Sequence, residues 1–172
     1  DADPGARITV HDEDAVFTPH GPTTARGKTV FFRAVHQDMG LIGGYSIVDN
    51  VAMIIGYERS RFGSIKWAAQ EARTRKLLAT VGAQELDVHA AVKSCTPLQQ
   101  TQIAIARAIY GWEGQHGLLI LDEPTAALPA SQSEELFATI RALRDSGAAI
   151  LYVSHRHNSI LSLADPPTVI RG

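Results

Sequence analysis

The stretch LLILDEPTAAL, residues 118–128, decides how the rest of the chain is interpreted. Its first four residues are apolar, and the adjacent carboxylates of Asp122 and Glu123 follow them. A short apolar run of this kind is typical of a strand that is buried on both faces of a parallel sheet. Ligands bind at the carboxyl ends of such strands, where one carboxylate can hold a magnesium ion and the other can act on a water molecule. The alternative is a buried strand that leaves the core through an acidic turn and binds nothing.

The composition is that of one globular domain, because 45% of the 172 residues are apolar and 20% are charged. Lys plus Arg total 16 and Asp plus Glu total 18, so the net charge is −2 and no basic stripe indicates nucleic acid. The single cysteine, Cys95, excludes an internal disulfide and a Cys-based zinc site and suits a reducing compartment. No apolar run approaches the length of a membrane span, so we expect a soluble, cytoplasmic chain that reaches a membrane only through a partner.

A second apolar run, AAILYV at residues 148–153, predicts another strand. Between the two runs, Ser131 and Glu134 match a capping box, which predicts the start of a helix that Gly147 ends. The inward stripe of this helix is predicted to consist of Leu136, Phe137, Ile140 and Leu143.

Residues 117–153 therefore form one predicted β-α-β crossover, which should be right-handed. The carboxyl ends of its two strands are neighbours in such a unit, and His155 follows the second strand. We expect Asp122, Glu123 and His155 to face one cleft. A lone histidine at a strand end is, however, more often structural than catalytic.

The segment CTPLQQTQIAIARAI, residues 95–109, predicts a helix that begins at Thr96. Thr96 is a hydroxyl N-cap, Pro97 occupies the first helical position, and Gln99 completes a capping box. Its core-facing residues are predicted to be Ile103, Ala106, Ala108 and Ile109, with Gly111 ending the helix. This pattern needs no ligand, although a helix amino terminus is also an anion site.

Two further helices are predicted upstream of that segment. Ser46 can cap a short helix that runs through Met53, and residues 64–81 form a longer helix with Gly82 as its stop. Residues 84–92 predict a short helix or turn.

The segment PTTARGKT, residues 22–29, differs from the phosphate-binding P-loop pattern only by Pro in place of the first Gly. A P-loop follows a buried strand and opens a helix, whereas this segment follows turn residues and leads into residues 29–35, which have strand composition. We therefore interpret Lys28 as a turn lysine. Gln37 follows that strand, and taken alone it indicates no more than an exposed polar turn.

The string LLILDEPTAAL resembles the Walker B segment of ATP-binding cassette (ABC) ATPases. The resemblance implies that Asp122 holds magnesium through water and that Glu123 polarises the attacking water. It also implies that His155 is the switch histidine, which contacts the γ-phosphate and the catalytic water. Gln37 matches the Q-loop glutamine, which contacts the magnesium and the attacking water. Residues 38–53, DMGLIGGYSIVDNVAM, resemble the corresponding segment of carbohydrate importers.

The helix that begins at Thr96 corresponds to the LSGGQ signature of the family, which grips the γ-phosphate of the nucleotide on the partner subunit. Thr96 and Gln99 keep the expected chemistry. Pro97 has no N–H to offer a phosphate, and Leu98 brings a side chain where the backbone should approach closely. Pro129 stands where the family's D-loop carries an aspartate. We expect this signature to be weak or altered.

The fold implied by the resemblance is α/β, with part of the P-loop NTPase (ABC ATPase) core sheet and an inserted helical subdomain. Residues 1–37 and 112–172 would form the partial core, and residues 38–111 would form the helical subdomain, which ends in the signature helix. In the family a P-loop precedes the strand that residues 7–10 resemble, and no such segment occurs in this sequence.

The lack of a P-loop has two explanations, a piece of a longer protein or a natural remnant, and we prefer the first. Most of the affinity for triphosphate should then be missing, so we expect these 172 residues to be inactive alone. We also expect the edge of the strand at residues 148–153 to be bare and to drive self-association.

The function implied is that of the first nucleotide-binding domain of a carbohydrate importer, of the ribose, galactose or xylose type, which couples ATP hydrolysis to solute uptake. Its cofactors would be ATP and Mg²⁺. Its partners would be membrane permease subunits, a second ATP-binding domain and, indirectly, an external solute-binding protein. It would lie on the cytoplasmic face of the cell membrane. The alternative is a non-catalytic interaction module of the same fold, and an ATPase that acts on nucleic acid lacks any basic signal.

Overall fold

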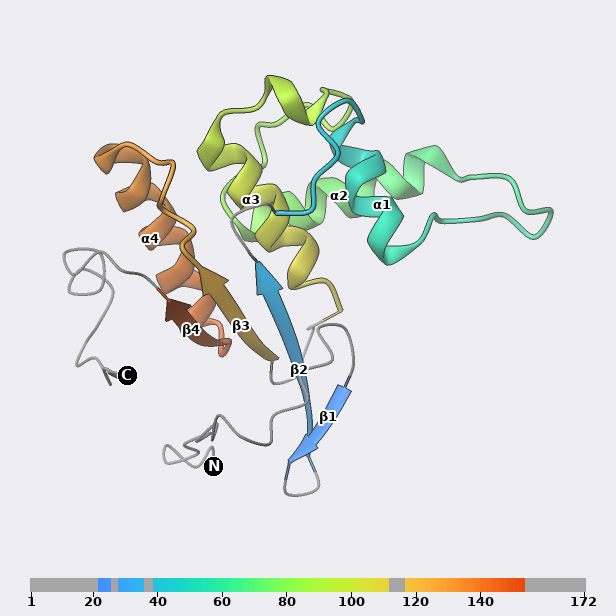
Figure 1. Cartoon of the computed structure of the whole chain (residues 1–172). Helices are drawn as coiled ribbons and strands as arrows, with labels where there is room; N and C mark the ends of the chain where they lie inside the picture. The colour runs from blue at the N-terminus through green and yellow to red at the C-terminus, as the bar shows by residue number, and fades with distance from the viewer. Residues whose placement is uncertain (1–21, 26–27, 36–38, 112–116, 154–172) are drawn as a thin grey trace.

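The computed structural model describes residues 22–25, 28–35, 39–111 and 117–153. Figure 1 shows these residues as a sheet with one helix beside it and a separate group of helices beyond the ends of its strands. The strand predicted at residues 7–10 lies outside the described residues, as do Gln37 and His155.

The described sheet has four strands in the order β1-β2-β3-β4. They are β1 (Pro22–Ala25), β2 (Lys28–Val35), β3 (Gly117–Asp122) and β4 (Ala149–Val153). β1 pairs with β2 antiparallel, whereas β2, β3 and β4 are parallel neighbours. The two strands predicted from apolar runs are thus confirmed, and their carboxyl ends share one edge of the sheet (Figure 1).

The GKT-containing segment is a β-hairpin. Pro22 pairs with Phe31 and Ala25 pairs with Lys28, so Lys28 is the first residue of the second hairpin strand. A P-loop lysine instead lies where a loop opens a helix. The interpretation that this segment is not a P-loop is confirmed.

Helix α4 (Ala130–Asp145) connects β3 to β4 and completes the predicted β-α-β unit. The whole predicted stripe is buried, with exposed fractions of 0% for Leu136, 2% for Phe137, 3% for Ile140 and 6% for Leu143. Gly147 adopts a φ of +100° just after the helix, a conformation that glycine reaches without a steric cost. The predicted stripe and stop of α4 are therefore confirmed.

The predicted capping box at the start of α4 is wrong. The N-cap is Pro129, which has φ −60° and ψ 157° and makes no side-chain cap hydrogen bond. Because the extended conformation of Pro129 lets the helix begin at Ala130, Ser131 lies within the first turn and cannot cap it. The Ser133 hydroxyl donates to the Pro129 carbonyl over 3.1 Å.

The second group of helices contains α1 (Ile47–Ile55), α2 (Trp67–Thr80) and α3 (Pro97–Ala108), with a short 3₁₀ turn at Val92–Ser94. Ser46 caps α1 as predicted, because its hydroxyl accepts a 3.1 Å hydrogen bond from the Asp49 N–H. Gly82, with φ +72°, follows α2 as predicted. In Figure 1 the three helices gather beyond the carboxyl end of β2.

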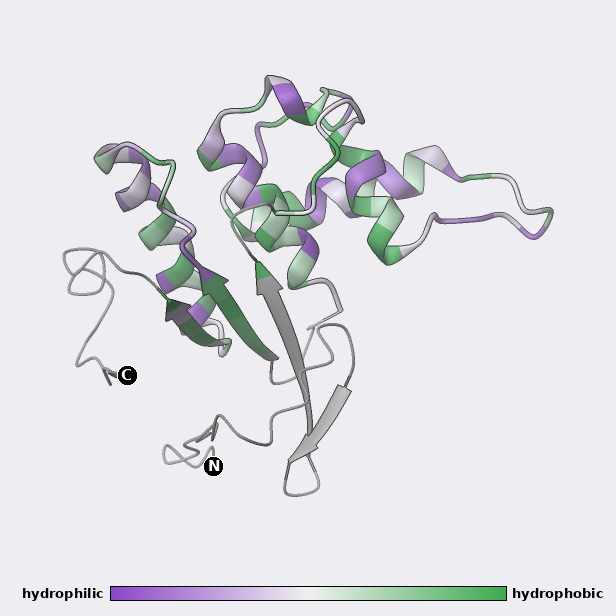
Figure 2. Ribbon diagram, viewed as in Figure 1, coloured by the Kyte–Doolittle hydropathy of each residue, from purple (hydrophilic) through white to green (hydrophobic). Residues whose placement is uncertain are grey.

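Helix α3 lies at the centre of the core. Ile103 and Ala106 are 0% exposed, Ala108 is 9% exposed, and Ile109 packs against the core cluster. The same cluster includes residues of α1, α2, β3 and α4, so apolar side chains on α3 join the helical group to the sheet. Figure 2 shows the apolar colour on β3, β4 and α1, with further patches on α3 and α4.

Within the described ranges, β4 is an edge strand that pairs with β3 alone. Its side chains alternate in burial, and Leu151 and Val153 are 37% and 40% exposed. An apolar strand at a sheet edge is suited to pairing with a further strand. Self-association through this edge stays a prediction.

Candidate functional site

The two carboxylates after the apolar run lie at the carboxyl edge of the parallel sheet. Leu121 pairs with Val35 on β2 and with Tyr152 on β4, and Asp122 pairs with Val153. The Glu123 N–H then donates to the Val153 carbonyl over 3.0 Å. Both carboxylate residues are half-buried, which leaves part of each accessible at this edge. Their predicted position is therefore observed, while their chemical roles stay predictions.

Glu123 has a left-handed backbone with φ +51°. This conformation costs a residue with a Cβ atom about 1–2 kcal/mol, and such strain is concentrated at functional sites. It turns the chain sharply, since the Ala126 N–H donates back to the Glu123 carbonyl over 3.1 Å. The strained residue is thus the one that the Walker B resemblance makes the catalytic base.

A buried hydroxyl pair fixes the turn that follows Glu123. The Thr125 and Tyr152 hydroxyl oxygens lie 2.9 Å apart, and Thr125 is only 1% exposed. The Tyr152 ring also packs edge-on against Phe137 of α4, with centroids 6.1 Å apart. Our sequence reasoning missed this pair; the only signal was one hydroxyl within the otherwise apolar run of β4.

The two other predicted catalytic residues follow described strand ends. Gln37 comes two residues after Val35 on β2, and His155 comes two residues after Val153 on β4. Two residues span at most about 7 Å; β2 ends opposite Leu121 and β4 ends opposite Asp122. Gln37 and His155 themselves lie outside the described residues, so their convergence on the carboxylates stays a prediction.

The predicted capping box of α3 is present in full. The Thr96 hydroxyl accepts from the Gln99 N–H over 3.3 Å, and the Gln99 side-chain oxygen accepts from the Thr96 N–H over 2.8 Å. Pro97 has no N–H, and the Gln100 N–H donates to the Thr96 carbonyl over 2.9 Å. Among the first three helical residues of α3, Leu98 is therefore the one whose N–H is left to bind another group. The helix amino terminus is largely satisfied by its own residues.

Leu98 is not placed as predicted. We expected its side chain to stand where the backbone should approach a phosphate, but Leu98 is 6% exposed and belongs to the core cluster. An apolar side chain in the first turn of a helix gains more by burial than by exposure at the open end. The obstacle to anion binding at this helix is thus the satisfied N–H groups and Pro97.

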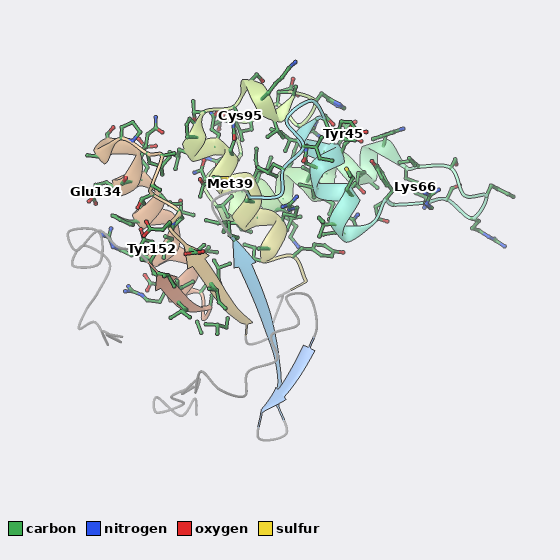
Figure 3. The ribbon with its side chains drawn as sticks, in the orientation of Figure 1. Met39, Tyr45, Lys66, Cys95, Glu134 and Tyr152 are labelled. Carbon is green, nitrogen blue, oxygen red and sulfur yellow. The ribbon has the colours of Figure 1, made fainter. Side chains whose placement is uncertain are left out.

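Arg107, in the last turn of α3, holds the segment that follows Gln37. Its Nη1 donates to the Gly40 carbonyl over 3.0 Å and its Nη2 donates to the Met39 carbonyl over 2.5 Å. Figure 3 shows Met39 between the end of β2 and α3. Burial lowers the pKa of the Arg107 guanidinium, which stays a cation at neutral pH. Arg107 lies 67 positions after Gly40 and 68 positions after Met39, and sequence reasoning missed this contact.

The donor set at the sheet edge fits a magnesium ion that shares its ligands with phosphate. Proteins usually supply one or two carboxylates to Mg²⁺, and Asp122 is the carboxylate that the resemblance assigns to the ion. Across the described ranges, no cluster of three or more His, Cys, Asp or Glu residues could hold a metal. The described residues also place the GKT lysine in a hairpin rather than before a helix, so they offer no P-loop cradle to the phosphates.

The fold matches solved ATP-binding cassettes. A cassette dimer in a post-hydrolysis state, bound to ADP and Pi, aligns over 75% of this chain and 54% of its own with a TM-score of 0.56 and 23% identity. A second dimeric structure of a bacterial ABC transporter cassette gives a TM-score of 0.55 over 73% and 53% of the two chains. The described residues have the fold of an ABC ATPase.

The chain is also homologous to ABC sugar-import ATP-binding proteins. The ribose import ATP-binding protein of Chromobacterium violaceum is 39% identical over 149 residues, which are 87% of this chain and 29% of that protein. The fructose import ATP-binding protein of Bifidobacterium longum is 36% identical over 80% of this chain and 26% of its own length. The galactofuranose transporter ATP-binding protein of Escherichia coli K12 is 34% identical over 96% and 31%.

The ABC homology covers a limited part of each relative, because the chain spans less than a third of the length of the curated relatives it matches. No family model matches the chain. Among the described helices, none is long and apolar enough to cross a membrane.

Proposed function

We propose that the chain is part of the ATP-binding subunit of an ABC importer for sugars, in the first of its nucleotide-binding domains. The observation that carries the proposal is the position of Asp122 and Glu123, at the carboxyl end of a strand that lies between two parallel neighbours. This arrangement supports a nucleotide site at the sheet edge. The relatives are named for the import of ribose, fructose and galactofuranose, and these names support a sugar as the solute.

In the proposed reaction, Asp122 would hold a magnesium ion. Glu123 accepts a proton from the water that attacks the γ-phosphate, the bond from the γ-phosphorus to the bridging oxygen breaks, and ADP leaves. Magnesium would supply charge neutralisation at the phosphate oxygens. His155 contacts the γ-phosphate, and Gln37 senses the metal and the attacking water. The short span from the ends of β2 and β4 to these two residues supports their presence at the same edge.

The two composite sites of the proposed dimer are unequal. Thr96 and Gln99 would face the nucleotide of the second ATP-binding domain, but their polar groups already serve each other in the capping box. An N–H group that is satisfied within its own helix has less to offer to a phosphate. The nucleotide gripped by this signature is therefore held more weakly than the nucleotide at Asp122 and Glu123.

The proposed partners are permease subunits and a second ATP-binding domain, with an external solute-binding protein acting through the permease. The subunit lies on the cytoplasmic face of the cell membrane, held there by the permease. The 172 residues alone are expected to be inactive, since their GKT segment is a hairpin and cannot cradle a triphosphate.

The test is Glu123→Gln in the full-length protein, assembled with its permease. Loss of a general base should lower the ATPase kcat by about 10²-fold or more, while ATP binding is retained. Glu134→Gln is the matched control, because it makes the same change from glutamate to glutamine at an exposed residue in the first turns of α4 (Figure 3). An ATPase rate near that of the wild type in Glu123→Gln would remove Glu123 as the base.

A non-catalytic interaction module is the second candidate, favoured by the self-satisfied start of α3. In that case the full-length protein would bind neither ATP nor its analogues, and Asp122→Asn would leave its assembly with a permease unchanged. Equilibrium binding of magnesium and ATP to the full-length protein separates the two functions, because the importer subunit binds the nucleotide and the module does not.

A further inference from the structure

The contact of Arg107 with Met39 and Gly40 joins two parts of the molecule with different predicted tasks. Arg107 lies at the end of α3, the helix whose first residues form the signature. Met39 and Gly40 lie between β2 and α1, directly after Gln37 and Asp38. The guanidinium donates to two successive backbone carbonyls, through a different nitrogen to each. A planar fork of donors is suited to such a pair of acceptors, and a lysine ammonium is not.

The backbone of the turn is shaped so that this contact can form. Met39 and Gly40 have φ values of +50° and +54°, two successive left-handed residues of which only one is a glycine. A left-handed methionine is strained and persists only when its surroundings hold it. The Thr101 hydroxyl, also on α3 and buried, lies 3.9 Å from the Met39 sulfur. Met39 is therefore held to α3 through its carbonyl, while its sulfur only contacts Thr101, whose hydroxyl donates to the Pro97 carbonyl over 3.0 Å.

The two halves of the contact differ in exposure. The hydrogen bond to Met39 is partly buried and the one to Gly40 is exposed, and a hydrogen bond from a charged donor strengthens where water is excluded. Arg107 also lies 11 positions after Thr96, so the rigid helix spans about 16 Å between the signature and the guanidinium. A displacement at one end of α3 is thus delivered to the Met39–Gly40 turn at the other end.

We propose that Arg107 is a positioning residue that fixes the Met39–Gly40 turn, which follows Gln37 in the sequence, to the signature helix, so that this turn and the helix shift as one body when the helical part of the molecule moves. This inference rests on the proposed ATPase function for its kinetic consequence, but not for its structural one. Arg107 itself does not touch nucleotide in this account; it acts through the backbone of Met39 and Gly40.

The experiment compares three single substitutions in the full-length protein, assembled with its permease. Arg107→Gln removes the charge and the fork, and Arg107→Lys keeps the charge and the aliphatic stem. Arg75→Gln is the matched control, because Arg75 is exposed on α2 and pairs with Glu71 on the same helix. The readouts are the ATPase kcat, the KM for ATP and the hydrogen exchange of the amides of residues 39–45.

We expect Arg107→Gln to lower kcat by roughly fivefold to tenfold while KM for ATP changes by less than about twofold, because coupling and not nucleotide affinity is lost. Exchange of the amides of residues 39–45 should accelerate, and Arg107→Lys should fall between wild type and Arg107→Gln in both readouts. Arg75→Gln should match wild type. A wild-type kcat in Arg107→Gln, unchanged exchange in residues 39–45, or full function in Arg107→Lys would each overturn the proposal.

A double-substitution cycle with Gly40→Ala distinguishes positioning from general loss of structure. A Cβ atom on Gly40 would lie 3.5 Å from the Arg107 Nη2, an ordinary contact, so the substitution perturbs the turn mainly through its φ of +54°. If Arg107 acts through this turn, the effects of Gly40→Ala and Arg107→Gln on kcat should be strongly non-additive. If the double variant lowers kcat by the product of the two single-variant factors, the proposal is contradicted.

The role of Arg107 and the proposed function can fail separately, because one is measured by amide exchange and the other by ATP hydrolysis. If the wild-type protein hydrolyses no ATP, the proposed function is wrong, and the amide exchange of residues 39–45 in Arg107→Gln still decides whether the guanidinium holds the turn.

Discussion

The hydroxyl groups of Thr125 and Tyr152 lie 2.9 Å apart, in a site where Thr125 is 1% exposed. One residue belongs to the turn that follows the paired carboxylates, and the other belongs to the neighbouring strand β4. The pair therefore ties the turn after Glu123 to the sheet, and it does so with polar atoms that are costly to leave unpaired when they are buried.

Tyr152→Phe should destabilise the protein by about 1–3 kcal/mol, because it leaves the buried Thr125 hydroxyl without this partner. The double variant Thr125→Val with Tyr152→Phe removes both polar groups and should recover much of the loss. Urea unfolding measures both values. Tyr45→Phe, at a residue that is 52% exposed, is the control and should change little. A double variant less stable than Tyr152→Phe would contradict the assigned contact.

Glu123→Gly should be more stable than Glu123→Ala by about 1 kcal/mol, since only glycine adopts a φ of +51° without steric cost. Both variants lose the same carboxylate, so their difference isolates the backbone. Thermal unfolding of the two proteins measures it, and ATPase activity should be lost in both. Equal stability would show that the left-handed conformation of Glu123 carries no strain.

Thr96→Ala should lower stability by about 1 kcal/mol, the usual effect of losing an N-cap hydroxyl. Its effect on ATPase turnover should be small by comparison, because the hydroxyl already accepts the Gln99 N–H. Thr96→Ser, which keeps the hydroxyl, is the control for both measurements. A turnover loss of 10²-fold in Thr96→Ala with unchanged stability would instead assign the hydroxyl to the nucleotide.

Burial raises the pKa of the Cys95 thiol above its ordinary value. The neutral thiol is then favoured in the folded state, so alkylation at pH 8 should be slower in the folded protein than in urea. The same shift means that stability from this group is fully present below the unfolded thiol pKa and declines as pH rises through the raised value. Iodoacetamide labelling rates and unfolding at several pH values measure the two effects, with Cys95→Ser as the control.

Local patterns predicted the elements whose signals lie within a few residues of each other. The capping box at Thr96 needed only Thr96, Pro97 and Gln99, and all three act as predicted. The β-α-β unit followed from two apolar runs and one helical stripe. The hairpin at Lys28 followed from the strand composition after it. In each case the residues that decide the structure are neighbours in the sequence.

Contacts between distant segments were not predictable in the same way. Arg107 reaches Met39 across 68 positions, and Thr125 meets Tyr152 across 27. Nothing local marks Arg107 as different from a solvated arginine at a helix end. The prediction for Leu98 was wrong for a related reason, because the direction of its side chain depends on the core that surrounds α3. At α4 a nearby proline displaced the expected serine cap.

The hairpin that contains Lys28 has a practical consequence for anyone preparing a catalytically dead mutant. Substitution of the lysine in a GKT triplet is the habitual choice for silencing a nucleoside triphosphatase. Here Lys28 pairs with Ala25 as the first residue of a hairpin strand, and it is not part of a phosphate-binding loop. Such a mutant would be a misleading negative control for the proposed ATPase, because turnover that remained would come from an unaltered site and would be mistaken for contamination.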